Sequence, residues 1–176
     1  KHLDLDSWLA DLKSDRDALT DLYLRAKDVT PERDAKLKEL KDALLDKLET
    51  PINKGNKKAI VFTAFTDTAT YLYDNLESWA KDDLGLNIAL VSGKYLRSTF
   101  GKAEFGNILT NFSPRSKDRD RKASMPQEGE IDILIATDCI SEGQNLQDCD
   151  YLINYDIHWN PVRIIQRFGR IDRLGS

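Results

Sequence analysis

The apolar residues at the start of the chain predict two amphipathic helices. Between residues 4 and 27 they recur every three or four positions, the period of a helix with one apolar face, at Leu5, Trp8, Leu9, Leu12, Leu19, Leu22, Tyr23 and Ala26. Asp4, Asp6 and Ser7 are suited to cap its start. A second helix, with Thr30 as N-cap and Pro31 at its first position, presents Leu37, Leu40, Leu44 and Leu48. We expect a helical hairpin over residues 1–52, either a packing arm for another domain or an ordinary helical extension.

The pattern changes after the polar linker at residues 53–58. Four compact apolar runs of the buried-strand type follow, at Ala59 to Phe65, Ile88 to Ser92, Ile131 to Ala136 and Asp150 to Asp156. Helical periods separate several of these runs, and a further one follows Pro161. This alternation predicts an α/β domain over residues 53–176, with a parallel sheet and helices on both faces.

One stretch, Ser113 to Glu130, has neither period. Within it residues 115–122 mix five basic residues with two acids and lack apolar anchors, which is typical of a solvated segment. We expect a mobile basic loop over about residues 113–130. A phosphate-gripping arm is the alternative.

Composition narrows the class of protein. The 26 basic and 30 acidic residues leave a net charge of −4, so nucleic-acid binding would need a local basic patch. Cys139 and Cys149 are too few and too oddly spaced for a zinc site or disulfide framework, and we expect buried, reduced thiols.

No apolar run approaches the ~20 residues of a membrane span, so we expect a soluble cytoplasmic protein. Because the only methionine is Met125, we expect a piece of a longer polypeptide.

Candidate chemistry is concentrated near the end of the chain. Arg167, Arg170 and Arg173 are spaced three residues apart, with Gly169 before the middle one. On a helix these side chains share a face, and guanidinium groups match phosphate oxygens in geometry and charge. A basic helix face paired with acids elsewhere in the chain is the alternative, and Asp156 or Asp172 is able to supply such an acid.

Three sequence motifs lie in and before the segment that contains these arginines. They are Thr137-Asp138 with Glu142-Gly143 and Asn145-Leu146, then Trp159-Asn160-Pro161, then Gln166 to Arg173. In order and spacing they resemble the fifth motif, the Trp-Asn-Pro signature and the sixth motif of the second RecA-like domain of superfamily 2 helicases and translocases, closest to the SWI/SNF-like branch. The dense part of the resemblance covers about a quarter of the chain, and a looser one covers most of residues 57–176.

The resemblance implies roles for individual residues. Arg170 and Arg173 would be arginine fingers that reach the γ-phosphate of ATP, a contact worth a factor of ~10³ to 10⁵ in rate. Gln166 and Arg167 would organise the cleft, although Arg167 is equally suited to an ion pair inside the domain. Asn145 would approach the nucleotide, and Gly143 would shape the turn that allows it. The residues implied in nucleic-acid backbone contacts are Thr63, Ser92, Gly93, Lys94 and Thr137.

Several of these roles have a structural alternative. In the resembled family the loop after this strand touches the nucleic-acid backbone, which makes Thr66 a candidate beside Thr63, but the two threonines also suit a strand end and a helix cap. Trp159 resembles a stacking wedge and suits core packing as well.

The sequence contains no Gly-x-x-x-x-Gly-Lys-Ser/Thr loop. The resemblance therefore implies that ATP is shared with a missing N-terminal RecA-like domain, that this missing domain holds Mg²⁺, and that the present chain alone does not hydrolyse ATP. Double-stranded DNA is the nucleic acid that the SWI/SNF-like motifs favour, with no membrane partner. An RNA-directed helicase domain and a nonenzymatic scaffold that kept the fold are the alternatives.

Overall fold

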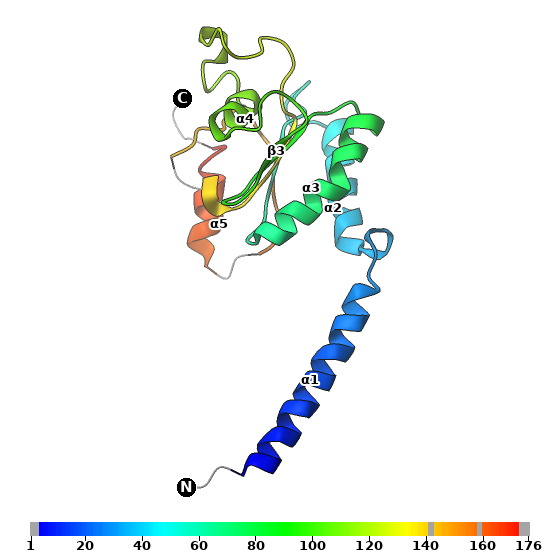
Figure 1. Ribbon diagram of the computed structural model, residues 1–176. Helices are drawn as coiled ribbons and strands as arrows, with labels where there is room; N and C mark the ends of the chain where they lie inside the picture. Colours follow the sequence, from blue (N-terminus) through cyan, green and yellow to red (C-terminus); the bar gives the residue numbers. More distant parts are fainter. Residues whose placement is uncertain (1–3, 141–142, 158–159, 173–176) are drawn as a thin grey trace. The chain divides into compact units, whose positions relative to one another are not determined.

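A computed structural model describes residues 4–140, 143–157 and 160–172 of the chain. The chain divides into two compact units, Lys1–Glu39 and Leu40–Ser176. The first unit contains α1 (Leu5–Lys27), which Figure 1 shows as one continuous helix. The helix begins where the Asp4 carboxylate accepts a hydrogen bond from the Ser7 amide at 3.2 Å, and none of its residues is buried.

The second helix starts later than the sequence pattern suggests. Thr30 and Pro31 introduce only a 3-10 turn at Pro31–Arg33, and Thr30 makes no capping hydrogen bond through its side chain. The α-helix α2 runs over Ala35–Glu49. Its cap is Asp34, whose carboxylate accepts from the amides of residues 36 and 37 at 2.9 and 3.0 Å. From Leu40 onward α2 belongs to the second unit, so a division of the chain at residue 52 remains a proposal.

The second unit is built on a five-stranded sheet in the order β3-β2-β4-β1-β5. The strands are β1 (Ala59–Phe62), β2 (Ile88–Val91), β3 (Leu96–Ser98), β4 (Ile133–Ala136) and β5 (Leu152–Asn154). Four of them are parallel, and each was predicted from an apolar run. The edge strand β3 pairs antiparallel with β2. It was not predicted, because three partly exposed residues carry no recognisable strand pattern.

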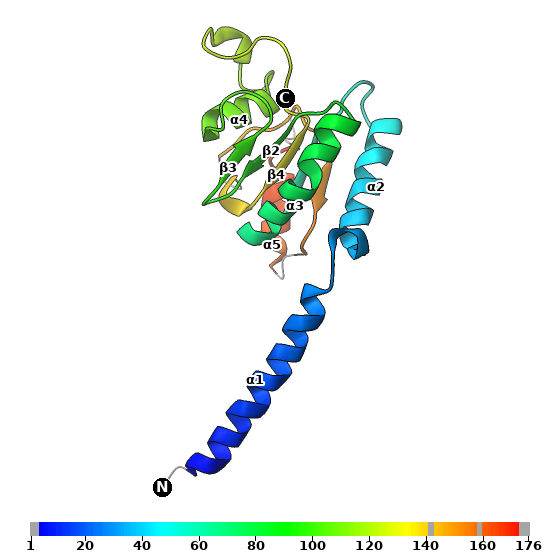
Figure 2. The same cartoon turned by 45° about the vertical axis from the view of Figure 1, so that its right-hand side comes forward.

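Helices cover both faces of this sheet (Figures 1 and 2). They are α3 (Thr66–Ser78), which continues into a π-helical turn at Trp79–Asp83, α4 (Phe105–Phe112) and α5 (Pro161–Phe168). Alternate strand residues meet α4 in one buried cluster that includes Ile60, Phe62, Ala89, Val91, Leu134, Ala136, Ile108, Leu109 and Phe112. The predicted α/β fold with helices on both faces is confirmed. Among the described helices, none is long and apolar enough to cross a bilayer.

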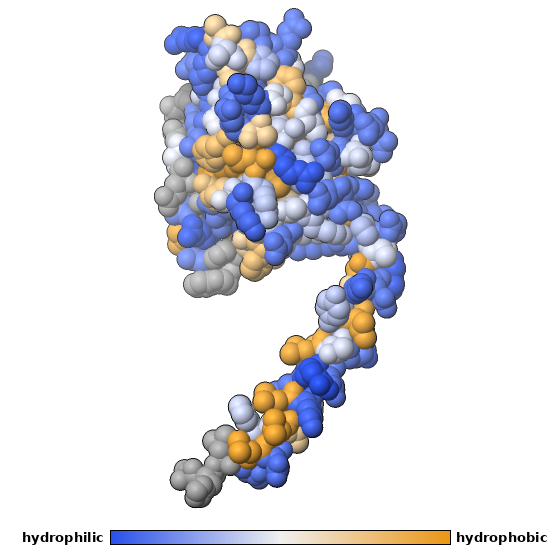
Figure 3. Space-filling model, in the orientation of Figure 1, coloured by the Kyte–Doolittle hydropathy of each residue, from blue (hydrophilic) through white to orange (hydrophobic). Residues whose placement is uncertain are grey.

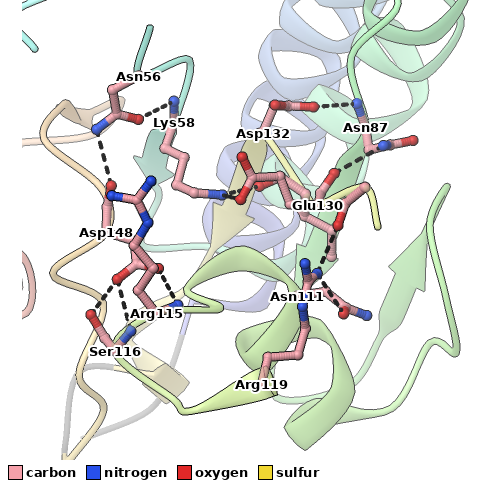
Figure 4. A network of polar contacts seen from close by, with 12 residues as sticks. Asn56, Lys58, Asn87, Asn111, Arg115, Ser116, Arg119, Glu130, Asp132 and Asp148 are labelled. Carbon is pink, nitrogen blue, oxygen red and sulfur yellow. Dashed lines mark hydrogen bonds and ion pairs between the residues drawn. The ribbon is translucent and has the colours of Figure 1, made fainter. Parts of the chain in front are cut away.

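Residues 113–130, expected as a solvated loop, are attached to the domain by polar contacts (Figure 4). The Asp148 carboxylate accepts from the amides of Arg115 and Ser116 at 2.7 and 2.9 Å. Arg119 is buried and donates to the Gly129 carbonyl at 2.7 Å and to the Asn111 side chain at 3.3 Å. Polar anchors hold the segment at both ends, and an apolar pattern does not reveal them.

Further polar contacts lie on the side of the sheet where the parallel strands begin (Figure 4). Lys58 lies 2.8 Å from a Glu130 carboxylate oxygen. Asp132 accepts from the Asn87 amide at 2.8 Å, and burial raises the pKa of this carboxyl group. We refer to this side of the sheet, at the starts of β1, β4 and β5, as the amino edge.

Candidate functional site

The opposite side of the sheet, which we call the carboxyl edge, brings three predicted contact residues into one row. Val91 and Phe62 both stand in register with Ala136. The next residue of each strand continues the ladder, because the Thr137 amide donates to the Val91 carbonyl at 3.1 Å and the Thr63 amide donates to the Ala136 carbonyl at 3.0 Å. Ser92, Thr137 and Thr63 therefore follow three neighbouring strands at the edge where ligands gather in open α/β sheets.

Arg167 is the buried centre of the carboxyl edge. Its guanidinium Nε donates to Asp138 Oδ1 at 2.7 Å, and Nη1 donates to Asn154 Oδ1 at 2.9 Å. The guanidinium carbon lies 5.2 Å from the centre of the Phe62 ring. Asp138 follows β4, Asn154 ends β5, and Phe62 ends β1. One side chain of α5 therefore contacts the ends of three strands. The acid that pairs with Arg167 is Asp138, rather than Asp156 or Asp172.

Thr63 also has an internal partner. Its hydroxyl donates to the Asp156 carboxylate, which accepts the Ala64 amide as well, at 3.3 Å. Thr63 is fully buried. In this arrangement the hydroxyl fixes the end of β5 against the end of β1.

The turn after β2 presents a cation to solvent. The Ser92 hydroxyl accepts the Tyr95 amide at 2.9 Å and donates to the Tyr95 carbonyl at 3.2 Å, which closes the turn around Gly93. Lys94 is exposed, with its ammonium 5.0 Å from the centre of the Tyr95 ring. Contact with Tyr95 raises the pKa of Lys94, so the ammonium form persists.

The loop at residues 143–149 is joined to the end of α5 through the backbone. Gly143 has a φ of +73°, a conformation that side chains with a Cβ rarely adopt. The Asn145 side chain accepts the Gln147 amide at 3.2 Å, which shapes the loop. The Leu146 amide then donates to the Arg170 carbonyl at 3.0 Å. Asn145, Gly143 and Arg170 thus belong to one connected segment.

α5 begins as its sequence predicts, with Pro161 at the first helical position. The Asn160 side chain caps the helix by accepting the Val162 amide at 3.0 Å.

Several polar atoms on α5 and just after it have no hydrogen-bond partner in the part of the chain that the structure describes. Arg170 is half-buried, forms no ion pair among the described residues, and has a buried Nε without a hydrogen-bond acceptor there. Within the same residues Gln166 Oε1 is buried without a donor, and Arg167 Nη2 is buried without an acceptor. Buried polar atoms are nearly always paired in folded proteins, so such a group calls for an explanation. Arg173, Glu142 and Trp159, which the sequence analysis also singled out, lie outside the described residues.

This arrangement fits an anionic group supplied from outside the domain. Arg170 carries a permanent positive charge for which no described residue supplies a counter-ion. The unpaired atom of Gln166 is an oxygen, which needs a hydrogen-bond donor rather than an anion. Within residues 4–140, 143–157 and 160–172, no group of three or more His, Cys, Asp or Glu residues is placed to hold a metal ion.

The two cysteines differ in environment. Cys149 is buried near the start of β5, and burial raises the pKa of its thiol to about 12. Cys139, which follows β4 at the carboxyl edge, is exposed, so the expectation of two buried thiols is wrong for Cys139. Both are free thiols, as expected.

The model of the helicase conserved C-terminal domain matches residues 35–175. The chain belongs to this family. It is 37% identical over 125 residues to an uncharacterized ATP-dependent helicase, YqhH, from Bacillus subtilis (strain 168), a match that covers 71% of this chain and 18% of the relative. It is 38% identical over 61 residues to the RNA polymerase-associated protein RapA of Vibrio campbellii, covering 34% of this chain and 6% of RapA. The chain thus spans less than a fifth of the length of these relatives.

Solved structures support the fold. The C-terminal part of the Fun30 ATPase domain superposes with a TM-score of 0.52 and 21% identity, covering 80% of this chain and 37% of that one. The Pyrococcus furiosus Hef helicase domain superposes with a TM-score of 0.51 and 26% identity, covering 77% and 23%. The resemblance to helicase C-terminal RecA-like domains that the motifs indicated is confirmed.

Two residues of the carboxyl edge were not predicted to have a specific role. Asp138 was noted as part of a motif, but its pairing with Arg167 depends on how α5 packs on the sheet. Asn154 lies within an apolar run. A lone amide in this partly buried strand was the available signal, because an amide away from solvent needs a partner.

Proposed function

We propose that this chain is the C-terminal motor domain of an ATP-dependent DNA translocase or helicase of the SWI/SNF-like kind. In this proposal Arg170 and Arg173 are the arginine fingers, and Gln166, Asn145 and Gly143 form the nucleotide side of the carboxyl edge. Arg167 organises the cleft indirectly, by fixing α5 to the strand ends. The protein acts in the cytoplasm.

The contrast between two arginines three residues apart supports the finger assignment. Arg167 is fully buried and paired with Asp138, whereas Arg170 has no acidic partner among the described residues. A guanidinium held beside a domain surface without a counter-ion is suited to stabilise charge that develops on a transferring phosphoryl group. Arg167 supplies the rigidity that this positioning needs.

The nucleic-acid side would use the row formed by Ser92, Thr137 and Thr63. Because the Ser92 and Thr63 hydroxyls have internal partners, the backbone at Gly93 and the exposed Lys94 ammonium are the groups best placed to meet phosphate oxygens. Such contacts position a protein on a nucleic acid without reading its sequence, as a translocase requires.

ATP would supply the phosphoryl group whose hydrolysis drives movement. The sequence contains no phosphate-cradling loop, so we propose that an N-terminal RecA-like domain of the same polypeptide holds the nucleotide and Mg²⁺. The present domain would then be inactive alone and would contribute when the two domains close on each other. The name of the relative YqhH, an ATP-dependent helicase, is consistent with this assignment.

The decisive experiment replaces Arg170 by alanine in the longer polypeptide that includes the upstream domain. DNA-stimulated ATP hydrolysis should fall by about 10³- to 10⁵-fold, the range for loss of an arginine finger. Arg163→Ala, on α5 but outside the proposed site, is the matched control and should keep its turnover. Equal turnover in the Arg170→Ala and unsubstituted proteins would refute the finger assignment.

The nucleic-acid preference needs a separate measurement. ATP hydrolysis by the unsubstituted long polypeptide is compared with duplex DNA, single-stranded DNA and RNA as stimulators. The proposal expects the largest stimulation by duplex DNA. Preferential stimulation by RNA would favour the RNA-directed alternative, and a complete absence of turnover with any of them would favour the scaffold.

A further inference from the structure

α1 carries an apolar stripe that is not buried in the structure. Seven of its large apolar side chains are between 44% and 66% exposed, at Leu5, Trp8, Leu9, Leu12, Leu19, Leu22 and Tyr23. Figure 3 shows apolar side chains gathered along this helix. A contiguous apolar surface of this kind marks an interaction site in a folded protein.

The stripe follows a heptad repeat. Leu5, Leu12, Leu19 and Ala26 occupy successive a positions, and Trp8, Asp15 and Leu22 occupy the d positions between them. Leu9 and Tyr23 widen the stripe at e, where Arg16 is the charged member. Apolar residues at a and d are the pattern by which helices pair as coiled coils. Asp15 interrupts this pattern at one d position, which lowers the stability of such a seam.

Between residues 11 and 16 the charges on the two sides of the stripe differ in sign. Asp11, at g, and Asp15, at d, lie along one side. Arg16, at e, and Lys13 lie along the other. Between Leu12 and Leu19 the surface of the helix is formed by these two leucines with Asp15, Arg16, Thr20 and Tyr23.

The charge pattern selects the partner and its direction. In a parallel pair the g side of one helix faces the e side of the other, and a d residue packs beside an e residue of its partner. Two parallel copies of α1 would therefore place Arg16 of each between Asp11 and Asp15 of the other. The two Asp15 side chains would face each other across the seam at d, and the two Arg16 side chains beside them would offset their repulsion. In an antiparallel pair like sides meet, so acid would face acid and base would face base.

We propose that α1 is a homodimerisation element that pairs two copies of this chain as a parallel, two-stranded coiled coil. The stripe supplies the seam, and the Asp11–Arg16 and Asp15–Arg16 contacts between copies fix its register. Arg16 now pairs with Asp17 at 2.6 Å on an exposed surface. Exposed ion pairs contribute little to stability. Arg16 therefore loses little when it leaves Asp17 to contact Asp11 and Asp15 of a partner. This inference is independent of the nucleotide chemistry proposed above.

Charge reversal tests the proposal on the whole chain. The mass in solution, measured by sedimentation equilibrium, should rise toward twice the 20.1 kDa of the chain with increasing concentration. Asp11→Lys alone and Arg16→Glu alone should each weaken dimerisation at least about tenfold, a change of roughly 1.4 kcal/mol. Mixing the two single variants should restore a dimer that contains one copy of each.

Asp6→Lys, the same charge reversal on the polar side of α1, is the matched control and should dimerise normally. Circular dichroism checks that each variant keeps its helices. A monomer at every concentration would overturn the proposal and leave the stripe to a different partner. A dimer that tolerates both single reversals would overturn it as well.

The direction of pairing has its own test. Leu12→Cys, made in a Cys139→Ser background, places two thiols at equivalent a positions of a parallel pair. Oxidation should then yield a disulfide-linked dimer, whereas Asp6→Cys in the same background should remain unlinked. Unlinked Leu12→Cys in a sample that is dimeric by mass would contradict the parallel arrangement.

Discussion

The two edges of the sheet differ in whether their charged side chains have counter-ions. At the amino edge, Lys58 pairs with Glu130 and Lys47 pairs with Asp150, although the Asn111 and Ser113 side chains leave neutral polar atoms buried without partners among the described residues. At the carboxyl edge Arg167 pairs with Asp138, whereas Arg170 has no ion pair and a buried Nε without an acceptor among the described residues. A cation without a counter-ion is available to an anionic ligand. This difference supports placing the proposed function at the carboxyl edge.

The largest effect expected within the domain is loss of the Arg167 pair. Asp138→Ala leaves the guanidinium of Arg167 buried without its carboxylate, and removing one partner of a buried pair costs about 3–5 kcal/mol. Urea unfolding of the chain should show this loss in the free energy of unfolding. Asp172→Ala, at an exposed carboxylate just after α5, should change it by less than about 0.5 kcal/mol. Equal effects would mean that Arg167 does not hold the strand ends.

A smaller effect, dependent on pH, is expected at the amino edge. Burial raises the pKa of Asp132 above its ordinary value of 3.8, an effect that Glu130 reinforces and Lys58 opposes. A raised pKa means that the folded state binds the proton more tightly, so this contribution to stability is present below pH 3.8 and is lost as the pH rises through the raised pKa. Asp132→Asn, which still accepts the Asn87 amide, should therefore gain stability relative to the unsubstituted chain as the pH rises.

Unfolding free energies measured between pH 4 and 7 check this expectation. A difference between the two proteins that is independent of pH would contradict it.

The smallest expected effect is a difference in the rate of thiol modification between two cysteines, one at each edge. Cys139 is exposed at the carboxyl edge, whereas Cys149 is buried and its pKa is raised to about 12. The thiolate is the reactive form. A chromogenic disulfide reagent at neutral pH should therefore modify one thiol of the native chain quickly and the second only after denaturation. Rapid modification of both native thiols would show that the amino edge opens readily.

The sequence predicted the parts of the fold that depend on apolar pattern. Each of the four parallel strands is a compact apolar run, and buried parallel strands need such runs on both faces. The short edge strand β3 has no such requirement, so its sequence carried no signal. The start of α2 was misplaced because Thr30-Pro31 and Asp34 both suit a helix start, and the choice between them depends on the local backbone.

The candidate site was predicted in its members but not in its contacts. Order and spacing of the motifs led to the family, while the pairing of Arg167 with Asp138 rather than Asp156 or Asp172 depends on how α5 packs on the sheet. The anchoring of residues 113–130 by Asp148 likewise joins positions more than thirty residues apart. Polar contacts of this range leave no periodic trace in a sequence.

The hydrogen bond from the Leu146 amide to the Arg170 carbonyl makes the proposed site convenient to dissect. Its acceptor is the main-chain carbonyl of Arg170, so a change of the Arg170 side chain removes neither the donor nor the acceptor. The loop that carries Asn145 should stay attached to α5 in such variants. A series of replacements at Arg170, from lysine to glutamine to alanine, would then report on charge and reach alone, free of collapse in the surrounding segment.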